Sequence, residues 1–284
     1  MTQQEKLIHL KKLLQDMERV VIAFSGGVDS TFLLKIAWDI LGEGVTAVTA
    51  TSSTYPEREL EEAVQFARQL GCTHEIIPSE ELEIEGFAQN PANRCYYCKH
   101  ELFSKLGQVA ERTGAAYVLD GSNLDDLGDF RPGMHAAKEL GVVSPLKEAA
   151  LTKEDIRQLS KQLGLPTWNK PAFACLSSRF PYGEVITAEK LKMVEEAEQF
   201  LLDLGFCQLR VRIHESMARI EVAPEERVRF FDMVLMDQVD DKLKKIGFSY
   251  VTLDLKGYRT GSMNEVLDES VRRISAEKAI DTKK

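Results

Sequence analysis

A short glycine-rich segment, Ser-Gly-Gly-Val-Asp-Ser at residues 25–30, has the composition of a loop that binds phosphate groups. It follows an apolar run at residues 20–24 and precedes residues 30–41, in which apolar side chains recur with helical spacing. A strand, a tight loop and a helix in this order bring unpaired backbone N–H groups and the positive end of the helix dipole to the loop. We therefore expect the phosphate contacts to come from Ser25, Gly26, Gly27, Ser30 and Thr31.

The acidic residue of this loop, Asp29, cannot donate a hydrogen bond to phosphate. Because carboxylates are preferred Mg²⁺ ligands, we expect Asp29 to hold a magnesium ion that bridges the phosphates. The segment lacks a Walker lysine, which favours binding of pyrophosphate as a leaving group over γ-phosphoryl transfer. A second polar segment, residues 120–126, follows another predicted strand, and we expect its Gly121 and Asn123 to lie near the nucleotide. An ordinary polar turn remains the alternative for this segment.

Three of the five cysteines form a second group of candidate residues. Cys95 and Cys98 form a C-x-x-C pair just before a predicted helix over residues 102–112, and Cys175 lies in the irregular segment 165–183. A C-x-x-C pair fits zinc, a redox pair or an iron–sulfur cluster. The sequence contains no second such pair that would complete a closed zinc site.

The elements that position these residues follow from the apolar pattern of the chain. Strands are expected at 20–24, 45–50, 75–77 and 115–119, and helices at 30–41, 57–70, 102–112 and 152–164. Strands that alternate with helices indicate an α/β fold with a parallel, doubly wound sheet. Beyond the segment 165–183, the pattern predicts a helix at 188–204, strands at 208–214 and 218–222, a helix after Pro224 and a strand at 250–255.

The irregular segment 165–183, rich in prolines and aromatic residues, is the predicted domain junction. We place a nucleotide-binding domain at residues 1–175 and a smaller α/β domain for substrate binding or oligomerisation at residues 176–284. Two further cysteines, Cys72 and Cys207, lie at the ends of predicted elements, and we expect both to be packed in the core.

Composition limits the classes of function. The chain has 284 residues, 44% of them hydrophobic and 29% charged, as in a globular protein of about two domains. Its net charge of −9 argues against a nucleic-acid partner. The charged N-terminal segment repeats Leu7, Leu10 and Leu14 with helical spacing, and no window approaches the ~20 apolar residues of a membrane span. We expect a cytoplasmic protein with no membrane partner, whose cysteines are thiols or metal ligands.

The segment Ile-Ala-Phe-Ser-Gly-Gly-Val-Asp-Ser at 22–30 resembles the pyrophosphate loop (PP-loop) of the N-type ATP pyrophosphatases. Those enzymes cleave ATP to AMP and pyrophosphate and form an adenylate. With residues 120–126, Arg-Pro-Gly at 131–133 and the segment 174–183, the chain closely resembles the LarE family of ATP-dependent sulfur transferases over about residues 20–259.

The resemblance implies an adenine nucleotide alpha hydrolase-like fold, ATP and Mg²⁺, and a small-molecule substrate. The family adenylates the carboxylates of pyridinium-3,5-biscarboxylic acid mononucleotide and converts them to thiocarboxylates, on the route to the nickel-pincer nucleotide cofactor of lactate racemase. We also expect a homo-oligomer.

The position that supplies sulfur in this family matches Cys175. Members with that cysteine alone give up its sulfur and end as dehydroalanine. The presence of Cys95 and Cys98 is similar instead to a three-cysteine subgroup, in which the thiolates hold a [4Fe–4S] cluster that carries an extra sulfide from a sulfide donor. A carried sulfide can be replenished, so we favour the cluster, and the sacrificial use of Cys175 stays open.

Arginines mark the expected substrate side. Residues 208–214 alternate polar and apolar, so Arg210 and Arg212 share one face of a strand, where two guanidinium groups suit a phosphate. A solvated strand face explains the same pattern. The resemblance places this pair and Glu198 near the proposed substrate phosphate, and we expect Arg179, four residues after Cys175, near the adenylate.

Three other functions compete with this interpretation. A tRNA 2-thiolation enzyme can also combine a PP-loop with three cysteines, although the negative net charge disfavours it. An amidotransferase-linked synthetase would need a glutaminase-sized segment and has no use for three thiols. A non-catalytic ATP-binding sensor would hold ATP without releasing pyrophosphate.

Overall fold

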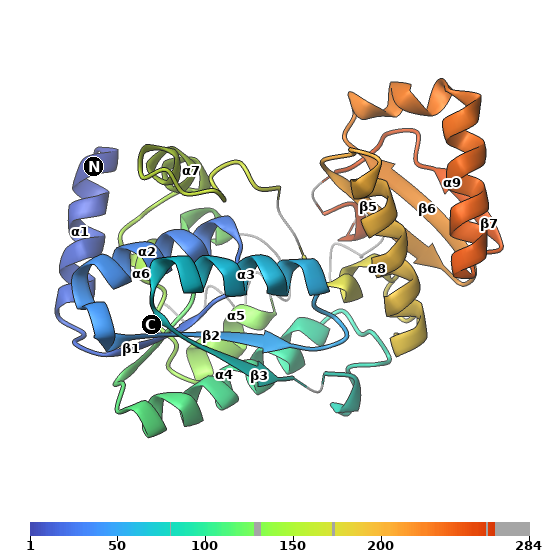
Figure 1. The fold of residues 1–284 in the computed structure, drawn as a ribbon. Coiled ribbons are helices and arrows are strands. Elements are labelled where there is room, and N and C mark those ends of the chain that lie inside the picture. Colours follow the sequence, from blue (N-terminus) through green and yellow to red (C-terminus); the bar gives the residue numbers. More distant parts are fainter. Residues whose placement is uncertain (80, 128–131, 172–173, 260, 265–284) are drawn as a thin grey trace. The chain divides into compact units, whose positions relative to one another are not determined.

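The computed structural model in Figure 1 describes residues 1–264 except 80, 128–131, 172–173 and 260. Arg131 of the Arg-Pro-Gly segment therefore lies outside the described residues. Contacts divide the described chain into two compact units, one formed by residues 1–81 and 93–173 and the other by residues 82–92 and 174–264. Nothing in the pattern of residues 82–92 indicates that this segment joins the second unit, and the domain boundary at residue 175 stays a prediction.

The first unit is built on a parallel sheet in the order β3-β2-β1-β4. Its strands are β1 (Val20–Ala23), β2 (Val45–Thr51), β3 (Thr73–Pro78) and β4 (Tyr117–Leu119). Val20 on the central strand β1 pairs with Val45 of β2 on one side and with Tyr117 of β4 on the other. This arrangement confirms the predicted α/β class and brings the carboxyl ends of β1 and β4 side by side.

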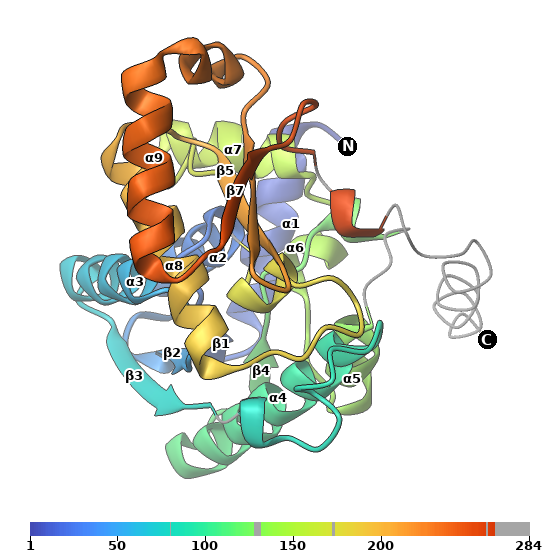
Figure 2. The same cartoon turned by 90° about the vertical axis from the view of Figure 1, so that its right-hand side faces the viewer.

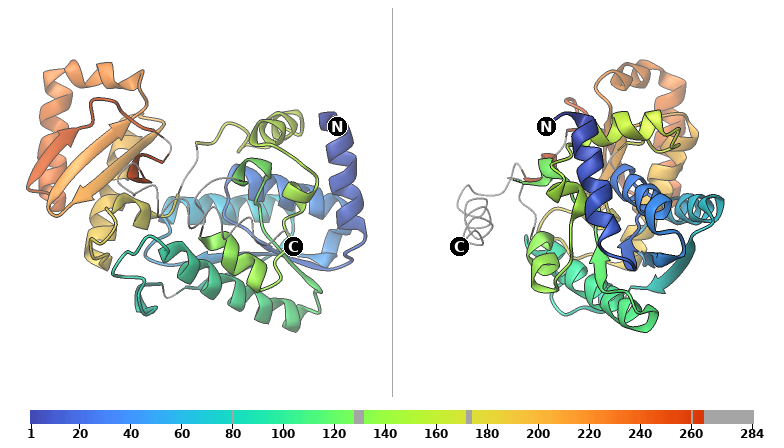
Figure 3. Two further views of the ribbon diagram at one scale, coloured as in Figure 1. Left: turned by 180° about the vertical axis from the view of Figure 1, so that it is seen from behind. Right: turned by 90° about the vertical axis from the view of Figure 1, so that its left-hand side faces the viewer.

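Helices cover both faces of this sheet. They are α1 (Gln3–Gln15), α2 (Val28–Leu41), α3 (Glu57–Leu70), α4 (Arg94–Thr113), α5 (Gly133–Glu139), α6 (Pro145–Glu148) and α7 (Lys153–Gln162). Helices α2 and α3 lie on one face and α4 and α5 on the other (Figures 1 and 3). The described residues contain no helix with the length and apolar character needed to cross a membrane.

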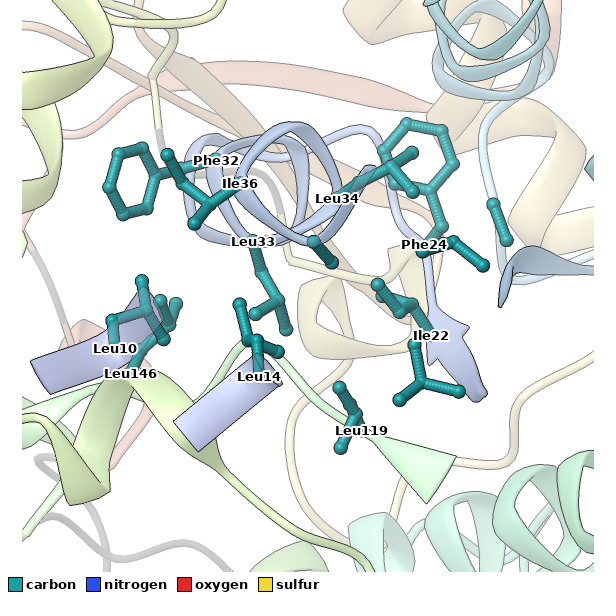
Figure 4. Packing of buried hydrophobic residues seen from close by; sticks show 14 of the residues in the cluster. Leu10, Leu14, Ile22, Phe24, Phe32, Leu33, Leu34, Ile36, Leu119 and Leu146 are labelled. Atoms are coloured by element: carbon teal, nitrogen blue, oxygen red, sulfur yellow. The ribbon is translucent and has the colours of Figure 1, made fainter. Parts of the chain in front are cut away.

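Successive residues of β1 alternate between the two faces of the sheet. Ile22 belongs to the buried cluster that contains Leu33 of α2 and Leu14 of α1 (Figure 4). Val21 packs instead into the cluster on the opposite face, with Phe103 of α4. Because both faces of β1 are buried, the strand is apolar throughout and the PP-loop that follows it starts from a rigid base.

The second unit combines a small mixed sheet with two long helices. Its elements are α8 (Ala188–Asp203), β5 (Leu209–His214), β6 (Met217–Val222), α9 (Met233–Ile246) and β7 (Tyr250–Leu253). β5 and β6 form an antiparallel hairpin, β6 and β7 are parallel, and α8 and α9 lie on the same side of the sheet (Figure 2). Asn90 ties the segment 82–92 to this unit, because its Nδ2 donates to the Pro181 carbonyl at 2.7 Å.

Two details of the sequence prediction were wrong, and two others were incomplete. The C-x-x-C pair does not precede its helix but lies within α4, which begins at Arg94. Cys207 is exposed, whereas Cys72 is buried as expected. The helix predicted after Pro224 is α9, and a short 3₁₀ helix over Glu226–Phe231 that was not predicted precedes it. Asp232 starts α9 by accepting from the Val234 and Leu235 amides. The short helices α5 and α6 gave no periodic signal.

Candidate functional site

The PP-loop links β1 to α2 and depends on glycine at its second position. Gly26 has φ of +62°, in the left-handed region, and a Cβ there would lie 3.1 Å from the Cβ of Ala63 on α3. The Ser25 amide donates to the Ser30 Oγ at 3.3 Å, and Gly27 is the N-cap of α2. The first-turn amides of α2 thus open onto the loop, as the sequence predicted.

The second polar segment meets this loop at Asp29. The Asn123 Nδ2 donates to the Asp29 Oδ1 at 3.3 Å. A Cβ on Gly121 would lie 3.1 Å from the Ser30 backbone nitrogen, so only glycine permits this close approach without displacement. Asn123 also caps the short 3₁₀ helix over Leu124–Asp126. The structure therefore brings together Asp29, Gly121 and Asn123.

Two lysines that sequence reasoning missed lie at the same loop. Lys153, the first residue of α7, forms an ion pair with Asp29. Thr152 starts α7 with a capping box, which fixes the position of Lys153 in the first turn of the helix. The predicted helix N-terminus at Thr152 was the available signal, because a lysine there projects from the first turn of a helix.

The second lysine, Lys170, lies between two glutamates of α3. Its Nζ is 2.7 Å from carboxylate oxygens of Glu59 and Glu62 and donates to the Gly26 carbonyl at 3.3 Å. Arg157 of α7 fixes the backbone here, since it donates to the carbonyls of Trp168 and Lys170 at 2.8 Å each. A loop distant in sequence thus supplies a cation beside the PP-loop.

A pocket of about 360 Å³ lies beside the PP-loop and is bordered by Gly26, Phe66 and Lys170. The hydroxyls of Thr31 and Thr167 also belong to residues that line it. Both Oγ1 atoms are buried and have no hydrogen-bond partner within the described part of the chain. A bound ligand with donors or acceptors would satisfy them, since buried polar atoms are rarely left unpaired.

Burial and the charge of Lys170 act in opposite directions on the pKa values of the two glutamates in this wall. Burial raises the pKa of Glu59, and the ion pair with Lys170 only partly opposes it. At the more open Glu62, burial is outweighed by Lys170 and Arg58, and the pKa is lowered. The Tyr55 hydroxyl donates to the Ser25 carbonyl at 2.9 Å, and burial together with the two glutamates raises its pKa, so it stays a donor.

The cysteine pair lies on the first turns of α4. Cys95 and Cys98 are three residues apart, which puts both on one side of the helix, and both are half-buried. The Cys98 thiol donates to the Glu81 Oε1 at 3.5 Å, and the Thr54 hydroxyl donates to Glu81 at 3.0 Å. Among the described residues, no three His, Cys, Asp or Glu side chains converge as metal ligands.

The third candidate cysteine belongs to the second unit. Cys175 is half-buried and is the N-cap of a 3₁₀ helix over Leu176–Arg179. Its carbonyl accepts from the Ser178 amide at 3.0 Å and from Arg179 Nη1 at 2.9 Å. Arg179 Nη1 also donates to the Ala174 carbonyl. The turn that carries Cys175 is therefore held by the side chain of Arg179.

Arg179 and Glu198 form a buried, two-pronged ion pair. Arg179 Nε and Nη2 donate to the two carboxylate oxygens of Glu198 at 2.9 and 2.6 Å, and the Val211 amide donates to the same carboxylate at 2.8 Å. Burial alone would raise the pKa of Glu198, but the charges of Arg179 and Arg210 outweigh it, and the pKa is lowered.

The arginine pair on β5 is buried rather than solvated. Arg210 is 3% exposed and Arg212 5% exposed. Arg212 donates to Glu221 of the neighbouring strand at 2.9 and 3.1 Å and to the Ser178 carbonyl at 2.9 Å. Burial and the charge of Arg179 lower the pKa of Arg210 to about 10. Buried, crowded guanidinium groups favour the arrival of an anion at Arg210.

Comparison with known proteins finds relatives that span nearly the whole chain. A family model described as NAD synthase matches residues 3–99, which include the PP-loop. An uncharacterised Synechocystis protein is 47% identical over 264 residues, which cover 93% of this chain and 98% of that protein. The pyridinium-3,5-bisthiocarboxylic acid mononucleotide synthase of Lactiplantibacillus plantarum is 43% identical over 258 residues, 90% of this chain and 93% of that enzyme. An uncharacterised Methanocaldococcus jannaschii protein is 31% identical over 259 residues, 90% of this chain and 98% of that protein.

Proposed function

Because this chain belongs to the family of the pyridinium-3,5-bisthiocarboxylic acid mononucleotide synthase, we propose that it is an ATP-dependent sulfur transferase acting on the corresponding biscarboxylic acid mononucleotide. A substrate carboxylate oxygen attacks the α-phosphorus of ATP and pyrophosphate leaves. A sulfur nucleophile then attacks the carboxyl carbon of the adenylate, and AMP leaves with the carboxylate oxygen. The observation that carries the proposal is the convergence of Asp29, Asn123 and the first-turn amides of α2 on one loop.

The first unit holds the nucleotide in this proposal. The α2 amides and the Ser25 and Ser30 hydroxyls bind the pyrophosphate part of ATP, where the helix dipole favours negative charge. The carboxylate and amide oxygens of Asp29 and Asn123 fit the hard-oxygen preference of Mg²⁺. Lys153 leaves Asp29 for a phosphate when the ion binds. The buried hydroxyls of the neighbouring pocket support a ligand at this place.

We propose Cys95, Cys98 and Cys175 as the ligands of a [4Fe–4S] cluster. Cys95 and Cys98 sit at the N-terminus of α4, whose dipole favours bound negative charge, and three thiolates leave one iron of a cubane without a protein ligand. When bound, the cluster supplies an exchangeable sulfide. The polypeptide keeps the three cysteine thiolates in place as ligands of the cluster. The proposal is supported by donor chemistry and by the family resemblance.

The substrate phosphate is proposed to bind at the arginines of β5, which crowd positive charge at Arg210. Arg212 keeps its place through Glu221. We also propose that the protein is cytoplasmic and forms a homo-oligomer. Its sulfide comes from an external donor, and it has no nucleic-acid partner.

Mass spectrometry of the mononucleotide tests the function directly. Anaerobic protein, ATP, Mg²⁺ and a sulfide source should convert each carboxylate to a thiocarboxylate, with one oxygen replaced by one sulfur. Omission of ATP should stop the conversion. If thiolated tRNA forms under these conditions and the mononucleotide stays unchanged, the proposal is wrong.

A further inference from the structure

We propose that Arg179 and Glu198 are a positioning pair that fixes the direction of Cys175, and that they do not contact the substrate. The inference rests on the proposed function, because it takes Cys175 as the residue through which sulfur reaches the adenylate.

The donors of Arg179 are committed to the protein. Its side chain is completely buried, with an exposed fraction of 0%. Nε and Nη2 bind Glu198, while Nη1 donates to the carbonyls of Ala174 and Cys175 and to the Ser178 Oγ at 3.1 Å. A guanidinium used in this way presents no face to a phosphate or an adenylate. Arg179 thus joins the carboxylate of Glu198 on α8 to the backbone of Cys175.

Glu198 is held in turn by a helix and a neighbouring strand. It lies on α8, is 5% exposed, and accepts the Val211 amide of β5 at 2.8 Å. The contacts therefore run from α8 and β5 through Glu198 and Arg179 to the Cys175 carbonyl. Both charges of the pair are buried and matched, so each depends on the other for stabilisation.

A second clamp holds the other end of the same turn. Arg212 donates to the Ser178 carbonyl at 2.9 Å and is itself fixed by Glu221, which is fully buried. The turn 175–178 is thus held at its first residue by Arg179 and at its last by Arg212. Two buried ion pairs, Arg179–Glu198 and Arg212–Glu221, therefore hold the backbone of this four-residue turn. They restrict the directions available to the Cys175 side chain.

Restricting that direction matters for sulfur delivery. Transfer requires the sulfur nucleophile to approach the adenylate carbon along a defined line, and a misplacement of about 1 Å can cost about 100-fold in rate. Groups that hold a reacting residue in this way change the rate of the step without changing how tightly the substrate binds. A direct contact with the substrate, as expected from the sequence for Arg179 near the adenylate and for Glu198 near the substrate phosphate, would change binding instead.

Two variants and one matched control test this distinction. Arg179→Lys keeps the charge but loses the forked donor set, and Glu198→Gln is nearly isosteric and can still accept the Val211 amide. Arg229→Lys is the control, because Arg229 also donates to two backbone carbonyls of the second unit, those of Leu204 and Gly205 at 2.7 and 3.1 Å.

Steady-state kinetics with the mononucleotide as varied substrate separate rate from binding. Both variants should lower kcat for thiocarboxylate formation by about 10- to 100-fold, with KM for the mononucleotide changed by less than about twofold. Pyrophosphate release in a single turnover should stay at the unmodified rate, since adenylation precedes sulfur attack. The control should match the unmodified protein. An increase in KM with kcat intact would overturn the inference and restore a substrate-binding role.

Amide hydrogen exchange of the full-length chain provides a readout that does not depend on activity. The Ser178 amide, which donates to Cys175, should exchange faster in both variants, and the control should leave it protected. If Arg179→Lys fails to fold, Glu198→Gln alone decides the test. Unchanged protection of Ser178 overturns the inference. Absence of thiocarboxylate formation by the unmodified protein contradicts the proposed function instead, and the exchange result still shows whether the pair holds the turn.

Discussion

Lys153 forms an ion pair with Asp29, although the two residues are 124 positions apart in the sequence. The pair joins the first turn of α7 to the first turn of α2. Both partners have a stronger alternative during catalysis, because a magnesium ion suits the carboxylate and a phosphate suits the ammonium. We infer that nucleotide binding replaces this ion pair with two other contacts, one between Asp29 and the magnesium ion and one between Lys153 and a phosphate.

Replacement of the Asp29 carboxylate should stop adenylation. Asp29→Asn removes the charge that would hold Mg²⁺, and pyrophosphate release should fall by about 100-fold or more. A coupled assay for pyrophosphate in the presence of the mononucleotide measures the loss. Asp39→Asn is the control, since Asp39 is also an α2 aspartate paired with a lysine, Lys35, but on the surface. Equal rates for both variants would contradict the assigned role.

Loss of Lys170 should destabilise the first unit in a pH-dependent way. Lys170 and Glu59 have side chains 10% and 5% exposed, and breaking a buried pair costs about 3 kcal/mol. The pKa of Glu59 is already raised by burial, so ionising it weakens the fold as pH rises, and without Lys170 this loss should increase.

Denaturant unfolding of Lys170→Met should therefore show a greater loss of stability at about pH 8 than at about pH 5, where a larger share of Glu59 is protonated. Lys35→Met, which breaks a surface pair, should change stability by less than about 1 kcal/mol at both pH values. A loss for Lys170→Met that does not change with pH would show that Glu59 is not its main partner.

Removal of either cysteine of α4 should abolish iron binding. Anaerobically prepared protein should contain about four iron atoms per chain and absorb as a cubane cluster, and Cys95→Ala or Cys98→Ala should bleach it. Iron and acid-labile sulfide assays measure the effect, and Cys207→Ala, at an exposed cysteine, should leave both unchanged. Stoichiometric zinc with no iron after anaerobic reconstitution would refute the cluster.

Cys175→Ser should separate the two half-reactions. Pyrophosphate release depends on the PP-loop and should continue in a first turnover. Thiocarboxylate formation should stop, because the variant lacks the thiolate that holds the cluster or gives up its own sulfur. Intact-protein mass spectrometry of the unmodified chain after several turnovers with added sulfide should give an unchanged mass. A mass lower by one H₂S, located at residue 175, would show that Cys175 gives up its own sulfur.

The nucleotide side of the site was predictable from the sequence because it depends on local rules. The PP-loop and the segment 120–126 each follow a predicted strand, and the pairing of β1 with β4 in the structure brings Asn123 to Asp29. Lys153 and Lys170 were missed because a lysine in a first turn or a loop has no pattern of its own. Only tertiary packing brings them to the PP-loop.

The substrate side shows the opposite case. Strand alternation correctly predicts that Arg210 and Arg212 share a face, but not that this face is buried. The partners that decide this, Glu221 and Glu198, lie on a neighbouring strand and a helix, and sequence spacing does not reveal such pairings. The C-x-x-C pair was placed outside its helix because the first turns of α4 carry half-buried side chains without apolar periodicity.

The fate of one oxygen atom tests the central claim most directly. The mononucleotide, labelled with ¹⁸O in its carboxylates, is incubated with the protein, ATP, Mg²⁺ and a sulfide source, and AMP and inorganic phosphate are analysed by mass spectrometry. If the carboxylate attacks the α-phosphorus and sulfur later displaces AMP, each AMP carries one ¹⁸O and the products are AMP and pyrophosphate. Appearance of ADP with ¹⁸O in inorganic phosphate would mean that the γ-phosphoryl group is transferred, and would contradict an adenylating sulfur transferase.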